Sequence, residues 1–189
     1  MIFSLPAAGY ALETPHMAKR YFILLLALLC TGPALASWGD FEYNFDDDSK
    51  PWREIQAQLP AYPDLKTALP FFVSAATDNK FFIDPKSISV GEDGIVRYTL
   101  IVQSPSGVLN VSFEGIRCAT HEKKLYAFGR EDNTWSRNRY AKWTPIKYED
   151  LNRQHHVLYD DFFCPDAIIV KDANEAISAL KRGLHSYAK

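Results

Sequence analysis

The sequence has little of what marks the common classes of nucleic-acid-binding and catalytic proteins. Lysine and arginine number 21 against 23 acidic residues, a formal charge of −2, so the basic excess of a dedicated nucleic-acid binder is absent. The sequence contains no G-x-S-x-G elbow, no glycine-rich phosphate loop and no calcium-loop spacing of ligands. These absences favour a protein with no enzymatic activity and no cofactor, and they remove nucleic acid from its expected partners.

Long apolar runs are missing as well, and the one apolar stretch of note belongs to an export signal. A segment beginning at Met17 places two basic residues ahead of the apolar stretch 21–30, about half of the roughly 20 residues needed to cross a bilayer. Small residues follow it, which predicts a secretory signal peptide cleaved between Ala36 and Ser37. Residues 1–16 would be an upstream segment, and the mature chain is not expected to span a membrane.

Cysteine is scarce: the chain has only three. Cys30 falls within the signal peptide, and Leu29 before it is too bulky for lipoprotein processing, so we expect a periplasmic protein without a lipid anchor. Cys118 and Cys164 remain, and an oxidising compartment allows them a single intramolecular disulfide. The alternative is a reactive thiol at Cys118 beside His121. We favour the disulfide, because charged side chains near a turn are ordinary.

The pattern of apolar residues predicts an extended lead-in over 37–51 and one α+β domain over 52–189. Trp52, Ile55 and Leu59 recur at helical spacing and predict an N-terminal helix over 51–59. Helices are expected again near the C-terminus, over 148–163 and after Asp172, where a glutamate three residues on completes a capping box.

Between these helices the period of the apolar residues changes to two, which predicts a meandering antiparallel sheet. The strand candidates are 71–74, 80–84, 87–90, 95–103, 108–118 and 125–129, with further short strands over 133–146. The apolar phase shifts beside Gly115, which indicates a bulge there that would turn Cys118 toward the core. The predicted architecture is this sheet packed against N- and C-terminal helices and tied by one disulfide.

Four segments occur in the order that a known family shows: FFIDPKSISVGEDGIVRYTLIV, NVSFEGIRC, KLYAFGR and DDFFCP. Together, from Trp52 to Pro165, they resemble the family named after the cryptic neisserial protein, a group of exported bacterial proteins of uncharacterised function. The resemblance implies a periplasmic or envelope location in a Gram-negative bacterium, and it supports Cys118 and Cys164 as a structural pair. The layout is also similar, less closely, to the surface-adhesin protein E type of module. Neither likeness supplies a catalytic residue.

One segment interleaves cations with aromatic residues and is the candidate binding face. Its members are Arg130, Trp135, Arg137, Arg139, Tyr140, Lys142 and Trp143. Such a surface holds anionic groups through its cations and stacks on sugars or lipids through its rings. We interpret it as a face for an unknown envelope component or partner protein. The alternative is that the tryptophans belong to the core and the arginines cover their edges.

The histidines offer the alternative of a hydrolase or metal-dependent periplasmic enzyme that uses His121, His155 or His156. Adjacent side chains diverge by about 100° on a helix, so His155 and His156 converge poorly on one ion. The sequence therefore favours a non-enzymatic interaction module that binds no metal.

Overall fold

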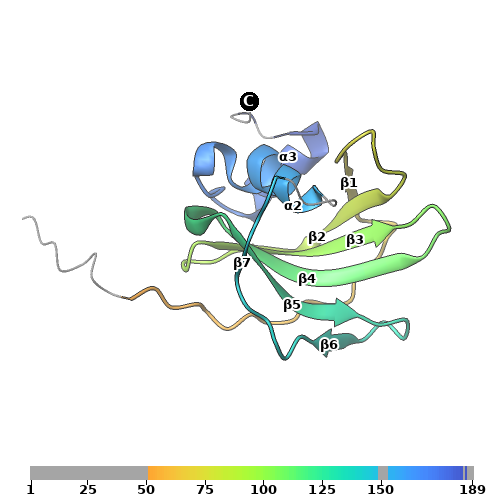
Figure 1. Ribbon diagram of the computed structural model, residues 1–189, viewed down its shortest axis with the longest axis horizontal. Coiled ribbons are helices and arrows are strands. Elements are labelled where there is room, and N and C mark those ends of the chain that lie inside the picture. The colour runs from red at the N-terminus through yellow and green to blue at the C-terminus, as the bar shows by residue number, and fades with distance from the viewer. Residues whose placement is uncertain (1–50, 149–152, 185, 187–189) are drawn as a thin grey trace, which may run out of the picture. The chain divides into compact units, whose positions relative to one another are not determined.

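A computed structural model describes residues 51–148, 153–184 and 186 (Figure 1). Over these residues the chain forms a seven-stranded antiparallel sheet with helices near the C-terminus, so the predicted α+β class is confirmed. The predicted cleavage site between Ala36 and Ser37 and residues 37–50 of the lead-in lie outside the described residues.

The sheet is a meander in which each strand pairs with the one before it, in the order β1 to β6, and β7 pairs with the beginning of β5. The strands are β1 Leu69–Phe71, β2 Lys80–Val90, β3 Ile95–Gln103, β4 Leu109–Arg117, β5 Glu122–Gly129, β6 Trp135–Arg137 and β7 Thr144–Pro145. The predicted strands over 80–84 and 87–90 are two halves of β2, with an irregularity between Asp84 and Ser89.

The helical layer is short and follows the sheet in the sequence. It contains α2 Gln154–Val157, the π-helical η3 Leu158–Phe163, the 3₁₀ turn η4 Pro165–Ala167 and α3 Ala173–Arg182, whereas a separate 3₁₀ turn, η2 Cys118–Thr120, connects β4 to β5. The Asp172 carboxylate caps α3 by accepting the Glu175 N–H at 2.9 Å, as its sequence predicts. No helix in the described part of the chain is long and apolar enough to cross a membrane.

One face of the sheet packs against these helices, which lie above β2 and β3 in Figure 1. Strands β2 to β4 contribute Ile83, Tyr98 and Ile116, and the helical layer contributes Phe163 and Leu180. The predicted disulfide is present: it joins Cys118, directly after β4, to Cys164, directly after η3, with the Cα atoms 5.5 Å apart. Both cysteines are buried, so the bond links the sheet covalently to its helical cover.

The opposite face is covered by residues 51–63, which we call the N-terminal strap. The strap contains neither helix nor strand, so the N-terminal helix predicted over 51–59 is wrong. A smaller core lies beneath it, in which Ala57 packs with Phe113, Tyr126 and Ala127. Trp52 and Ile55 are 39% and 50% exposed, so the apolar residues at helical spacing do not form a buried stripe.

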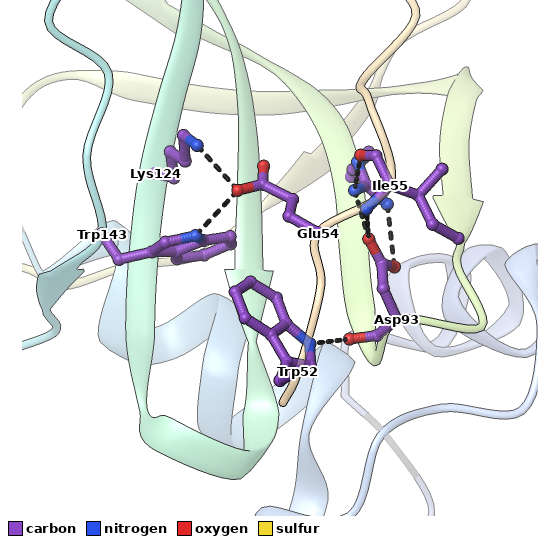
Figure 2. A network of polar contacts seen from close by, with 7 residues as sticks. Trp52, Glu54, Ile55, Asp93, Lys124 and Trp143 are labelled. Carbon is purple, nitrogen blue, oxygen red and sulfur yellow. Dashed lines mark hydrogen bonds and ion pairs between the residues drawn. The ribbon is translucent and has the colours of Figure 1, made fainter. Parts of the chain in front are cut away.

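Polar contacts explain why the strap is not helical (Figure 2). Asp93, in the turn between β2 and β3, accepts the Ile55 N–H at 2.8 Å, and its carbonyl accepts the Trp52 indole N–H at 2.8 Å. The guanidinium of Arg97 donates to the Ile55 carbonyl at 2.7 Å and to the Asp93 carboxylate at 2.6 Å. The sheet therefore takes both peptide groups of Ile55, which a helix would have paired internally.

The predicted bulge at Gly115 is also wrong. Strands β3 and β4 pair without interruption, and the register shift falls between β4 and β5, where Tyr126 is the extra residue. The apolar phase changes because β4 is buried on both faces: Phe113 packs beneath the strap, whereas Ile116 packs beneath the helices. Gly115 is required for a different reason, since a Cβ there would lie 2.9 Å from the Tyr126 ring.

We expect loss of the disulfide to destabilise the fold by about 4 kcal/mol, the chain-entropy value for a loop of this length. The sequence separation of the two cysteines is 46. The measurement is urea unfolding of the wild type against the double variant Cys118→Ala, Cys164→Ala. Two free thiols in unreduced, denatured mature protein, which lacks Cys30, would contradict the pairing.

The Asp93→Ala variant is expected to lose about 3 kcal/mol of unfolding free energy, because it leaves the guanidinium of Arg97 buried without its carboxylate. Glu92→Ala is the matched control: it removes an exposed acid from the same turn and should change stability by less than about 0.5 kcal/mol. Equal losses in the two variants would show that the Asp93–Arg97 pair does not anchor the strap.

Candidate functional site

The candidate binding face lies along the β6 edge of the sheet (Figure 1). Arg130 is in the turn between β5 and β6, and the other members are in β6 and its connection to β7. The two tryptophans of the face turn toward the strap. The Trp135 indole donates to the Pro60 carbonyl at 2.9 Å, and the Trp143 indole donates to the Glu54 carboxylate at 3.1 Å. Figure 2 shows Glu54 held between Trp143 and Lys124, whose ammonium lies 2.7 Å from the same oxygen. Both tryptophans therefore hold the strap in place.

The other members of the face are exposed. The Arg130 guanidinium donates to the Ser136 hydroxyl at 3.2 Å. The side chains of Arg137, Arg139 and Lys142 make no hydrogen bond or ion pair with any residue that the structure describes. Tyr140 is 87% exposed. The structure thus separates the predicted face into tryptophans that pack and a cationic half, Arg130, Arg137, Arg139, Tyr140 and Lys142, that faces solvent.

A tight turn holds the centre of this cationic half against the sheet. The Asn138 N–H donates to the Tyr126 carbonyl at 2.8 Å, and its side-chain amide donates to the Leu125 carbonyl at 3.0 Å. Its side-chain oxygen accepts the Tyr140 N–H at 3.1 Å, and its main-chain carbonyl accepts the N–H three residues on at 3.4 Å. Four bonds from one residue therefore fix the backbone that carries Arg139 and Tyr140.

A pocket of about 320 Å³ lies beside this turn, between β5, the 138–144 segment and α2. The side chains that line it and bear on its chemistry are Glu114, Lys123, Tyr140, Lys142, Thr144 and His155. The Thr144 hydroxyl donates to the Lys123 carbonyl at 3.3 Å, which ties the connecting segment to β5.

Glu114 is a buried carboxylate on the floor of the pocket. It accepts hydrogen bonds from the Tyr98 hydroxyl at 3.1 Å and the Ser112 hydroxyl at 2.6 Å, and it lies 2.6 Å from His155 Nε2. Burial alone would raise the pKa of Glu114. The hydrogen bonds from His155, Ser112 and Tyr98 outweigh burial, and the pKa of Glu114 lies below its ordinary value.

His155 connects this carboxylate to Lys123, whose ammonium lies 2.9 Å from Nδ1. An ammonium group can only donate, so Nδ1 is the acceptor and Nε2 carries the proton directed at Glu114. Of these residues the sequence alone indicates His155 as a candidate, but not Glu114. The available signal was an acid within the apolar strand sequence "NVSFEGI", on the same face as Ile116.

The other two histidines lie apart from this chain of contacts. The His121 ring stacks on Tyr159 with centroids 4.0 Å apart, and His156 Nε2 lies 3.0 Å from the Asp160 carboxylate. The His121 and His156 rings are 6.5 Å apart. Within 51–148 and 153–184, no three histidine, cysteine, aspartate or glutamate side chains are placed to hold a metal ion.

Replacing Glu114 with glutamine should change how stability depends on pH. A carboxylate whose folded pKa is lowered contributes stability above its ordinary pKa of 4.5, and this contribution is lost as the pH falls through the folded value. We expect Glu114→Gln to cost about 2 kcal/mol at pH 7 and progressively less in more acidic solution, as measured by urea unfolding. Glu131→Gln, at an exposed position, is the control. A difference between Glu114→Gln and the wild type that did not vary with pH would contradict the assignment.

Comparison with known proteins agrees with the resemblance that the sequence motifs carry. Cryptic neisserial protein 1 of Neisseria gonorrhoeae is 28% identical over 152 aligned residues, which cover 67% of this chain and 75% of that protein. No solved structure gives a significant match. The model of the CNP1-like family matches residues 47–181, well over half of the sequence, and the chain therefore belongs to the CNP1-like family, whose function is uncharacterised.

Proposed function

We propose that this protein is an exported, non-catalytic binding module of the cell envelope that holds an anionic envelope component on the cationic half of its candidate face. The signal-peptide pattern and a neisserial relative support export. The disulfide between Cys118 and Cys164 supports it too, because disulfides persist in oxidising compartments such as the periplasm.

The observation that carries the binding proposal is a set of cations on the sheet edge that are exposed and make no ion pair with any residue the structure describes. In a chain with a formal charge of −2, Arg137, Arg139 and Lys142 concentrate positive charge in one place, and none pairs with an acid among the described residues. A guanidinium group offers several donors in a plane and suits phosphate and carboxylate groups. A fixed turn backbone also lowers the conformational entropy lost on binding.

The geometry offers one argument for a periplasmic hydrolase instead. Glu114 orients the His155 imidazole at a pocket, an arrangement that general-base sites use. However, Lys123 occupies Nδ1 and Glu114 occupies Nε2, so neither nitrogen is available to take a proton from a substrate. Binding therefore accounts for the pocket better than catalysis does.

We expect the double variant Arg137→Gln, Arg139→Gln to bind isolated envelope vesicles about tenfold more weakly than the wild type, because it removes two unpaired charges. The assay is sedimentation with the vesicles at low and high salt, and binding by the wild type should weaken as salt rises.

The matched control is Lys66→Gln, Lys86→Gln, which removes the same charge from exposed positions outside the face and should bind as the wild type does. Unchanged binding by the arginine variant, or an equal loss in the lysine control, would overturn the proposed face.

A further inference from the structure

We infer that the pocket beside the Asn138 turn binds a phosphorylated sugar, with the phosphate near Lys142 and the sugar ring against Tyr140. The inference rests on the proposed function and deepens it by naming the class of ligand. The volume of the pocket, about 320 Å³, lies at the small end of the range for ligand pockets and suits a monosaccharide phosphate.

The charges around the pocket favour an anion. Its acid, Glu114, is already engaged, since Tyr98, Ser112 and His155 all donate to its two oxygens. The Lys142 ammonium, by contrast, has no hydrogen bond or ion pair within the described residues. Lys123 lines the same pocket, where its ammonium also contacts His155 Nδ1. Two lysines on one pocket can share the oxygens of a phosphate group, which lysine binds as a point charge.

Tyr140 supplies the surface for the ring. It lines the pocket, is 87% exposed and stacks on no described side chain, although an exposed aromatic ring gains nothing for the fold. Its backbone is fixed, because its N–H donates to the Asn138 side chain. A tyrosine held in this way gives an aromatic face and a hydroxyl for a polar ring at little entropic cost.

A phosphorylated sugar has two possible sources, a free sugar phosphate or the headgroup of a glycolipid. The first experiment titrates the protein with glucose 1-phosphate, inorganic phosphate and glucose, and follows the backbone amides by NMR. We expect glucose 1-phosphate to bind more tightly than either fragment and to shift the amides of Tyr140, Lys142 and Thr144. A second arm uses vesicles that carry a glycolipid phosphate against vesicles of phosphatidylglycerol; preference for the glycolipid would identify the membrane source.

Variants of the pocket residues test the phosphate contact of Lys142 and the sugar contact of Tyr140 separately. Lys142→Gln should weaken glucose 1-phosphate binding about tenfold, whereas Lys147→Gln, an exposed lysine that does not line the pocket, should have no effect. Tyr140→Ala should weaken glucose 1-phosphate binding about fivefold and leave inorganic phosphate binding unchanged.

Equal affinity for glucose and glucose 1-phosphate, or a Lys142→Gln variant that binds as the wild type does, would overturn the inference. The proposed function fails separately, when the Arg137→Gln, Arg139→Gln variant keeps its binding to envelope vesicles. If that variant loses vesicle binding while no sugar phosphate binds the wild type, the cationic face stands and the pocket inference falls.

Discussion

The central strand β3 is buried on both faces from Ile95 to Ile101, so the rest of the structure must cover both faces of the sheet. A sheet buried on both sides needs two covers, and the two covers here differ in kind. The helical layer brings a large apolar surface that includes Leu158, Phe163 and Leu180, and the disulfide ties it to the sheet covalently. The strap has Ala57 as its one buried apolar side chain, so it depends on polar contacts, above all those of Asp93.

Two buried polar clusters lie where the covers meet the sheet. On the strap side Asp93 and Arg97 form an ion pair, and on the helix side Glu114 meets His155. A buried ion pair adds little net stability, because desolvation offsets its Coulomb energy, but removing one partner is costly. Each cluster therefore favours the packing in which its two sides meet, because separating them would leave a buried charged group without its partner. The second cluster also places His155 and Lys123 at the pocket beside the Asn138 turn, so one set of contacts organises both fold and candidate site.

The sequence predicted the features that depend on local pattern. Alternation gave the β2–β3–β4 meander, and Asp172 marked the start of α3. It failed where distant residues decide the structure. Helical spacing over 51–59 did not produce a helix, because side chains about 40 positions away take the peptide groups of Ile55. The phase change at Gly115 predicts a bulge that the structure does not have, because one sequence cannot distinguish a bulge from a strand buried on both sides.

The candidate face shows the same division within one short segment. Clustering of cations and aromatic residues identified the segment, and each of the two interpretations offered for it, a binding face or a covered core, describes a part of its residues. Trp135 and Trp143 hold the strap, and through it they stiffen the edge on which Arg137 and Arg139 stand. Sequence alone did not separate the two roles, because each tryptophan's partner lies 75 or more positions away. A rigid edge lowers the conformational entropy that the exposed cations lose when they bind a ligand. The two packed tryptophans thus support the cations proposed to bind.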